Sequence, residues 1–156
     1  AYTGVNKRYV GAYRIPELKT MLEEVPEHIG INIEIKSSWV FDLRTARALV
    51  ALKNKLKNRP IIISSFNPLV LAYIHLFLRA APTGFLLESK KYFWIINWLQ
   101  PDYLHLRGDM VTEAVVSLCK ERNMKINAWT VNNKNAIKSL FNKQVVGVVT
   151  DMGAVI

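Results

Sequence analysis

GINIEIK, residues Gly30–Lys36, is the first of six short apolar stretches on which the fold class depends. It is rich in β-branched residues and includes two charged ones, Glu34 and Lys36. Runs of this length and composition are typical of strands in a buried parallel sheet. The other five expected strands are Pro60–Phe66, Thr83–Ser89, Asp102–Arg107, Lys125–Val131 and Val145–Asp151.

Between most of these stretches, apolar residues recur at helical spacing. Leu43, Ala46, Leu49 and Val50, for instance, follow the first expected strand. Strands that alternate with helices indicate an α/β fold built on a parallel sheet. The expected strands are not followed by the glycine-rich turns GxGxxG or GxxxxGK, so the sequence supports neither a Rossmann dinucleotide site nor a P-loop.

Each expected strand ends in side chains that can bind a ligand. They are Glu34 and Lys36, Ser64 and Ser65, Glu88, His105 and Arg107, Trp129 and Asn132, and Thr150 and Asp151. Alternation alone does not distinguish a barrel from a doubly wound sheet. The strand ends favour a (β/α)8 barrel, whose active site lies at the carboxyl ends of the strands and which has about 250 residues. We therefore expect a partial TIM-type barrel of about six parallel strands, forming a single domain over residues 1–156.

The composition indicates one folded domain with a basic surface. Of the 156 residues, 51% are hydrophobic, and 21 basic against 12 acidic residues give a net charge of +9. This excess favours anionic partners such as phosphates, nucleic acid or an acidic membrane surface. The single cysteine, Cys119, excludes an intramolecular disulfide. No apolar run reaches the roughly 18 residues of a membrane span, and the first 14 residues carry no apolar signal-peptide core.

In this order and at these spacings, several stretches resemble the glycerophosphodiester phosphodiesterases. RIPELKTMLEEV (residues 14–25) is similar to the segment before that family's third barrel strand, and GINIEIK is similar to the strand itself. IISSFNPLVLAYI (residues 62–74) resembles the fourth strand and its helix. PDYLHLRGDMV, KINAWTVNN and GVVTD resemble the sixth, seventh and eighth strands. The resemblance runs from about Arg14 to the C-terminus.

The chain also departs from the family pattern. Family members carry an N-terminal His-Arg-Gly strand, a Glu-x-Asp strand and a second catalytic histidine, which supply the acid–base histidines and two metal ligands. None of these motifs occurs here, and the three histidines, His28, His75 and His105, lie elsewhere. The resemblance therefore implies the last six units of the barrel without the first two.

Glu34 and Lys36 are two residues apart on an expected strand, so their side chains point the same way. A carboxylate near a barrel mouth can bind a hard divalent cation, and an ammonium can hold a phosphate oxygen. The resemblance implies that Glu34 ligates Mg²⁺ or Ca²⁺ and that Lys36 is a catalytic residue beside the phosphate. From the residues alone, an ion pair between Glu34 and Lys36 is the simpler explanation. The resemblance makes the metal ligand and the phosphate contact the preferred explanation instead.

Four further residues are candidate substrate contacts. The resemblance implies that Trp129 lines the pocket and that His105 lies near the substrate, with core packing as the alternative for both. Ser65 and Phe66 end an expected strand, where a hydroxyl can donate to phosphate. Asn67–Pro68 is expected to begin the next helix, with the asparagine as its cap.

The resemblance implies metal-assisted hydrolysis of a glycerophosphodiester to glycerol 3-phosphate and an alcohol, a reaction of lipid and glycerol metabolism. The alternative is a barrel remnant that binds phosphate or a partner without catalysis, which the missing histidines favour. A basic nucleic-acid-binding protein is a third hypothesis. We expect no nucleic acid partner, because no aromatic residues interleave the basic run Lys53–Arg59.

Six strands of an eight-stranded barrel leave open edges beside Gly30–Lys36 and Val145–Asp151, and open edges pair with other chains. We therefore expect either a homo-oligomer or an N-terminal segment that closes the sheet. The basic run Lys53–Arg59 is expected to be a solvated face, and peripheral contact with anionic lipid is its alternative.

Overall fold

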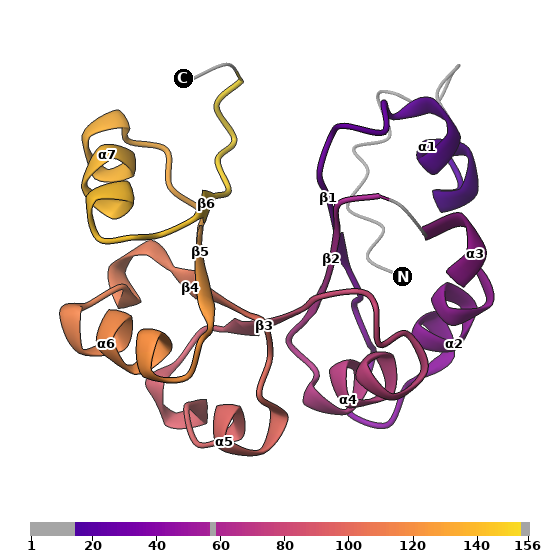
Figure 1. Ribbon diagram of the computed structural model, residues 1–156, viewed down its shortest axis with the longest axis horizontal. Helices are drawn as coiled ribbons and strands as arrows, with labels where there is room; N and C mark the ends of the chain where they lie inside the picture. The colour runs from indigo at the N-terminus through magenta and orange to yellow at the C-terminus, as the bar shows by residue number, and fades with distance from the viewer. Residues whose placement is uncertain (1–14, 57–58, 154–156) are drawn as a thin grey trace.

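The structure is a computed structural model that describes residues 15–56 and 59–153. Its six strands form one parallel sheet in the order in which they occur along the chain, and the sheet curls into an open arc (Figure 1). The expected fold, a partial TIM-type barrel of six parallel strands, is confirmed. The strands are β1 (Ile31–Glu34), β2 (Ile61–Ser65), β3 (Thr83–Leu87), β4 (Tyr103–Arg107), β5 (Lys125–Trp129) and β6 (Gly147–Val148).

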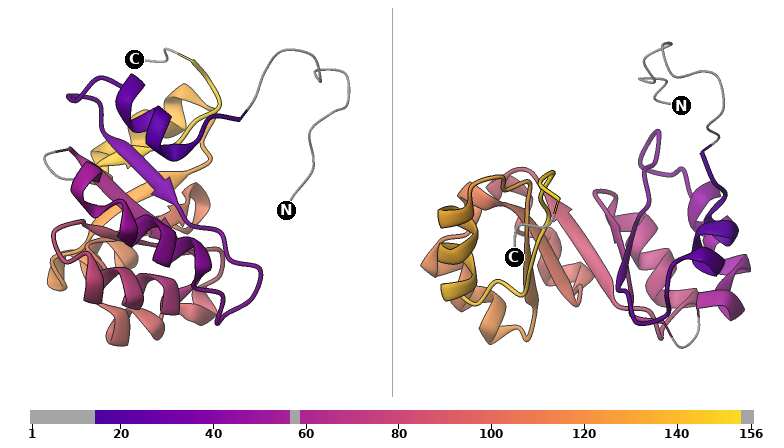
Figure 2. Two further views of the ribbon diagram at one scale, coloured as in Figure 1. Left: turned by 90° about the vertical axis from the view of Figure 1, so that its right-hand side faces the viewer. Right: turned by 90° about the horizontal axis from the view of Figure 1, so that it is seen from above.

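The helices lie on the convex side of the sheet, as three directions of view show (Figures 1 and 2). They are α1 (Leu18–Glu24), α2 (Arg44–Ala51), α3 (Lys53–Leu56), α4 (Pro68–Phe77), α5 (Ile95–Leu99), α6 (Glu113–Glu121) and α7 (Lys134–Asn142), with two short 3₁₀ helices, η2 (Lys90–Tyr92) and η3 (Gly108–Met110). None of the helices in the described ranges is long and apolar enough to cross a membrane. The first 14 residues, and with them the expectation about a signal peptide, lie outside the described residues.

Alternation along the strands separates a helix-covered face from a concave face. In the β1 region, Ile35 belongs to a buried cluster under α1–α4, and Ile31 and Ile33 pack against that cluster. Asn32 and Glu34 therefore point to the concave face. A second buried cluster lies between β3–β6 and the helices α5–α7, so the hydrophobic core follows the arc on its outer side.

Two glycines let side chains of a neighbouring strand fill the concave face. A Cβ atom at Gly84 of β3 would lie 2.5 Å from Nε2 of His105 on β4. A Cβ atom at Gly147 of β6 would lie 2.5 Å from Oδ1 of Asn127 on β5. Because any side chain at these two positions would overlap the imidazole or the amide, the glycines are what give His105 and Asn127 their places inside the arc.

The last strand is shorter than the sequence predicts, since β6 covers Gly147–Val148 and the expected stretch was Val145–Asp151. Val149 still donates to the carbonyl of Ala128 and accepts from the backbone N–H of Val131, but the segment after Val149 bonds to the side chain of Asn132. Asn132 Oδ1 accepts hydrogen bonds from the backbone N–H of Asp151 at 2.9 Å and from the Thr150 hydroxyl at 3.0 Å, and Asn132 Nδ2 donates to Asp151 Oδ2 at 2.9 Å. The backbone hydrogen bonds to the β5 side thus end at Val149, where the side-chain amide takes their place.

Candidate functional site

Glu34 and Lys36 lie at the carboxyl end of β1. Glu34 is the last residue of the strand, and Lys36 follows two residues later. Because Ile35 between them is buried on the helix side, both side chains point to the concave side. Both are exposed, and no ion pair joins these two described residues. The carboxylate and the ammonium are therefore open to a ligand.

A groove of about 480 Å³ runs beside these two charged residues. Trp39 and Val40, from the loop after β1, line it together with Phe66, from the end of β2. The groove thus combines one carboxylate and one ammonium with apolar surface. Such a site can bind an anion through Lys36 while the apolar side chains contact the carbon atoms of the same ligand.

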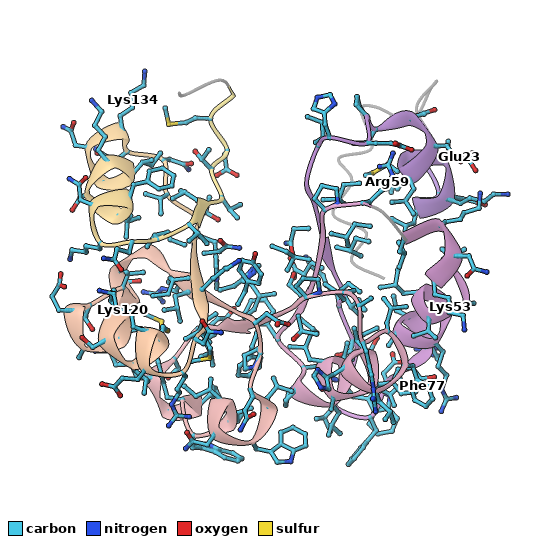
Figure 3. All side chains as sticks on the ribbon, in the orientation of Figure 1. Glu23, Lys53, Arg59, Phe77, Lys120 and Lys134 are labelled. Atoms are coloured by element: carbon cyan, nitrogen blue, oxygen red, sulfur yellow. The ribbon has the colours of Figure 1, made fainter. Side chains whose placement is uncertain are left out.

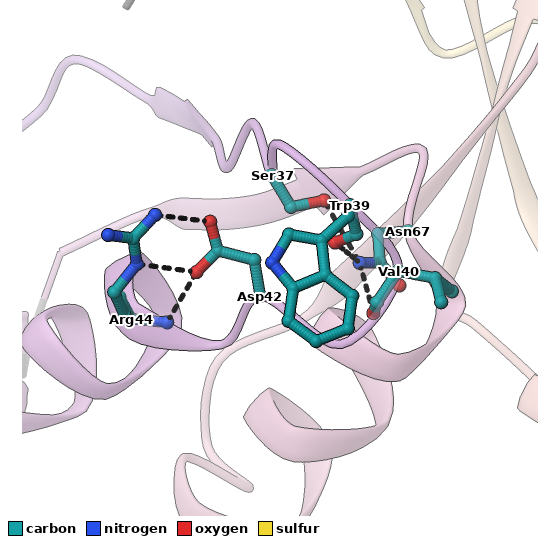
Figure 4. Close-up of polar contacts among 6 residues, drawn as sticks. All are labelled: Ser37, Trp39, Val40, Asp42, Arg44 and Asn67. Atoms are coloured by element: carbon teal, nitrogen blue, oxygen red, sulfur yellow. Dashed lines mark hydrogen bonds and ion pairs between the residues drawn. The ribbon is translucent and has the colours of Figure 1, made fainter.

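Asn67 fixes the loop that forms one wall of the groove (Figure 4). Its Oδ1 accepts from the backbone N–H of Leu69 at 3.0 Å, which caps α4 as the sequence predicts. Its Nδ2 donates to Ser37 Oγ at 2.9 Å and to the carbonyl of Val40 at 2.7 Å. The start of α4 and the loop after β1 are therefore held together by one buried side chain.

Asp42 and Arg44 close the far end of the same loop. Nε and Nη2 of Arg44 donate to the two carboxylate oxygens of Asp42, both at 2.9 Å, and the backbone N–H of Arg44 donates to Oδ1 at 3.2 Å (Figure 4). These hydrogen bonds hold the pKa of the Asp42 carboxyl well below its usual range. The carboxylate is charged at neutral pH but already paired with Arg44.

Ser64 and Ser65 differ in how their hydroxyls are used. The buried Ser65 hydroxyl donates to the carbonyl of Ile35 at 2.7 Å and accepts from the backbone N–H of Asn67 at 3.1 Å. Ser64 is also buried, and its hydroxyl has no hydrogen-bond partner among the described residues. The Ser65 hydroxyl therefore joins the end of β1 to the segment after β2. Its role as a substrate contact stays a prediction.

Phe66 and Trp129 meet although they come from strands that are not neighbours. Their rings pack edge to face, with centroids 5.7 Å apart and planes at 90°. Phe66 follows β2 and Trp129 ends β5, so the contact spans the concave side of the sheet. The indole N–H of Trp129 is buried and has no partner among the described residues. The pair extends the apolar surface of the groove toward the other half of the arc.

His105 is buried on the concave side of the sheet, away from the groove. It is the middle residue of β4, is 2% exposed, and its Nε2 lies 3.2 Å from Asn127 Nδ2. Burial lowers its pKa to about 4, so the ring is neutral at pH 7. The structure places this imidazole in the interior of the arc, and a contact with substrate there stays a prediction.

The structure brings most of the predicted site together. Glu34, Lys36, Ser65 and Phe66 line the same groove, and Trp129 contacts Phe66, whereas His105 lies apart from it. Sequence reasoning missed the apolar wall formed by Trp39 and Val40, and it missed the bonds from Asn67 to their loop. The two aromatic residues of the SSWVF stretch after the strand, Trp39 and Phe41, were the one signal that could have indicated the wall.

The described part of the chain does not complete a metal site. Within residues 15–56 and 59–153, no three His, Cys, Asp or Glu side chains gather closely enough to hold a metal ion. Glu34 is the one carboxylate that lines the groove. Mg²⁺ and Ca²⁺ take about six or more oxygen ligands, so Glu34 could supply only part of a coordination sphere.

The curled parallel sheet with a groove at the carboxyl ends of its strands defines the class of the TIM-type α/β barrel proteins. Within this class, residues 3–154 match the model of the Glycerophosphoryl diester phosphodiesterase family. The chain belongs to this family. No match was found among curated proteins.

Several solved structures share the fold. A phosphodiesterase of Oleispira antarctica in complex with the product sn-glycerol-3-phosphate has a TM-score of 0.70 and 24% identity, covering 79% of this chain and 51% of that chain. The glycerophosphodiester phosphodiesterase of Thermotoga maritima has a TM-score of 0.65 and 24% identity, covering 87% and 60%. A glycerophosphodiester phosphodiesterase of Parabacteroides distasonis has a TM-score of 0.65 and 18% identity, covering 80% of this chain and 53% of that chain. This chain therefore spans between 51% and 60% of the length of these structures.

Proposed function

We propose that this chain forms part of a barrel that hydrolyses glycerophosphodiesters to glycerol 3-phosphate and an alcohol. The observation that supports this best is the placement of Glu34 and Lys36 in one groove with Phe66, at the carboxyl ends of the strands. Family membership supports the same class of reaction, and the similar protein of O. antarctica holds sn-glycerol-3-phosphate.

Lys36 would stabilise the phosphate. An ammonium group beside a phosphoryl oxygen makes a charge-assisted hydrogen bond, and it stabilises the charge that develops there during hydrolysis. It is the one cation that lines the groove.

The rings of Phe66 and Trp129 would contact the glycerol or alcohol part of the substrate. Their rings pack edge to face, so the pair presents one apolar surface. We therefore propose these two residues as those that set which alcohol fits.

A bound divalent cation would polarise the phosphoryl oxygen as a Lewis acid. Glu34 would be one ligand of that Mg²⁺ or Ca²⁺ ion, and the coordination sphere would need further oxygens beyond those of the described residues.

The histidines of the described residues favour a second function. His28 and His75 are exposed, on the turn before β1 and on α4, and His105 is buried and neutral. None of the three lines the groove, so none is placed there to act as a general acid or base. Binding of a phosphate-containing ligand without turnover is accordingly the second candidate.

Two measurements on the same protein separate these functions. Hydrolysis of glycerophosphocholine would be followed by release of glycerol 3-phosphate, with Mg²⁺ or Ca²⁺ and then with a chelator. Binding of sn-glycerol 3-phosphate would be measured by calorimetry. Turnover that the chelator stops, and that Glu34→Gln abolishes, supports metal-assisted hydrolysis. Binding without turnover supports the second function, and the absence of both contradicts the two proposals.

A further inference from the structure

α4 is a surface helix with almost no polar side chain. In its sequence, PLVLAYIHLF, only Tyr73 and His75 carry polar groups. Val70, Leu71 and Ile74 are buried against the sheet, but Leu76 is 57% exposed. A helix that is apolar on all sides is normally covered on all sides. In the described structure, the outer side of α4 is open.

The neighbouring helix carries two exposed tryptophans. α5 lies beside α4 in the outer layer (Figure 1). Trp94, which precedes it directly, and Trp98, within it, are 66% and 59% exposed. Being four residues apart, they lie on one side of the helical turn. We call the four exposed side chains Leu76, Phe77, Trp94 and Trp98 on these adjacent helices the α4–α5 face.

Basic residues border the α4–α5 face. Lys90 and Lys91 precede α5, and Arg79 follows α4. Glu88 is the single acidic residue between Asn67 and Pro101 in the sequence. The two helices of the face are therefore flanked along the chain by basic residues.

A second groove continues this charge next to Phe77. Phe77 and Arg79 line it together with Lys53 and Arg59, and no acidic residue lines it. Figure 3 shows Lys53 and Phe77 on the same side of the molecule. The cations of this groove come from α3 (Lys53), the segment before β2 (Arg59) and the segment between α4 and β3 (Arg79).

We propose that the α4–α5 face docks on the surface of an anionic phospholipid bilayer. Tryptophan rings concentrate at the headgroup level of a bilayer, and lysine and arginine beside them are attracted to anionic headgroups. Charge complementarity favours this occupant over a second copy of the chain, because two such faces would bring like charges together.

A further pair of exposed aromatic residues lies beside the groove of the candidate site. Trp39 and Phe41 are exposed on the loop after β1, and their rings pack edge to face at 5.5 Å. Asn67 ties this loop to the first turn of α4. Leu76 and Phe77 lie at the other end of α4, so this aromatic pair is separate from the α4–α5 face. The docking does not depend on the proposed reaction, because vesicle binding and hydrolysis are measured separately.

Cosedimentation with vesicles tests the proposal. The protein is expected to bind vesicles of phosphatidylglycerol and phosphatidylcholine, and to bind pure phosphatidylcholine much more weakly. The double variant Trp94→Ser/Trp98→Ser should weaken binding about tenfold or more, because each buried indole removes a large apolar area from water. Lys90→Gln/Lys91→Gln should weaken it by about 30-fold, since each basic residue near an anionic surface contributes about 1 kcal/mol.

Matched variants on α7 and the segment after it provide the controls. Phe141→Ser/Val146→Ser removes two exposed apolar side chains, and Lys134→Gln/Lys138→Gln removes two exposed charges on the far side of the molecule, where Figure 3 shows Lys134. Both should bind as the parent does, with circular dichroism showing that every variant is folded. Equal losses in test and control variants, or full binding by the folded tryptophan variant, would overturn the proposal. So would a dimer in solution that only the tryptophan variant converts to a monomer.

Discussion

Lys36 is the residue on which binding of an anion in the groove depends most. The variant Lys36→Ala should weaken the affinity for sn-glycerol 3-phosphate by roughly 10- to 100-fold, because a hydrogen bond to a charged group contributes about 1.5–3 kcal/mol. Calorimetry measures this directly. Lys134→Ala removes the same charge from the exposed side of α7 and should leave the affinity unchanged. Equal losses in both variants would mean that only the net charge of the protein matters.

Trp129 shapes the groove through its contact with Phe66, so its removal should alter selectivity. In Trp129→Ala, the ratio of kcat/KM values for two glycerophosphodiesters with different alcohols should change several-fold. The concentration of divalent cation needed for half-maximal rate should stay the same. Unchanged ratios for all substrates would show that the indole serves only in packing.

His105 makes the stability of the protein depend on pH. The pKa of His105 is about 4 in the folded state, against 6.5 ordinarily, because burial disfavours the charged ring. Between these values the unfolded chain binds a proton at this residue that the folded chain does not bind, so the free energy of unfolding falls as the pH falls from 6.5 to 4. The total loss is about 3 kcal/mol, at about 1.4 kcal/mol per pKa unit.

Urea unfolding at pH 7.5, 5.5 and 4.5 measures this loss. His105→Gln should remove most of the slope between pH 6.5 and 4, whereas His75→Gln, at an exposed position of α4, should keep it. The same slope in both variants would assign the pH dependence to other groups.

At the scale of elements, Asn67 joins α4 to the loop after β1. Asn67→Ala should lower the free energy of unfolding by about 2–3 kcal/mol, of which the lost helix cap accounts for about 1 kcal/mol and the two bonds to the loop for the rest. The control is Asn133→Ala, because Asn133 caps α7 through the backbone N–H groups of Asn135 and Ala136 at 2.9 and 3.0 Å. That variant should lose only about 1 kcal/mol. Equal losses would mean that the loop bonds contribute nothing.

Most strands could be predicted because their apolar runs are local signals. Pro60–Phe66 was expected as a strand, and β2 covers Ile61–Ser65. The path of the chain after Val149 could not be predicted, since it depends on the side chain of Asn132, which lies 18 and 19 residues from its partners Thr150 and Asp151.

The candidate site was also predictable only where its residues belong to local sequence patterns. The family resemblance indicated Glu34 and Lys36, and the Asn-Pro pair indicated a helix cap. The contact of Phe66 with Trp129 joins β2 to β5 across the arc, and no local pattern encodes the curvature that brings them together.

For the molecule as a whole, the edges of the sheet are the feature with the clearest consequence. Among the described strands, β1 pairs only with β2 and β6 only with β5. The backbone N–H groups of Ile31 and Ile35 donate toward β2, so that of Asn32 points to the open edge. An unpaired edge is a template for another strand, so we expect self-association through β1.

Asn32→Pro tests this expectation, because proline removes the outward N–H without removing a bond to β2. Sedimentation velocity should show less self-association for the variant than for the parent at equal concentration. The melting temperature should stay within a few degrees, which shows that the sheet is intact. A parent protein that is monomeric at all concentrations would contradict the expectation.

The close fit of His105 over Gly84 also constrains how this protein can change over evolutionary time. A Cβ at position 84 would lie 2.5 Å from the imidazole, so a larger residue there becomes acceptable only after His105 has given way to a smaller one. The reverse order passes through a clash inside the arc. Substitutions at the two positions should therefore occur together, with the change at position 105 coming before the change at position 84.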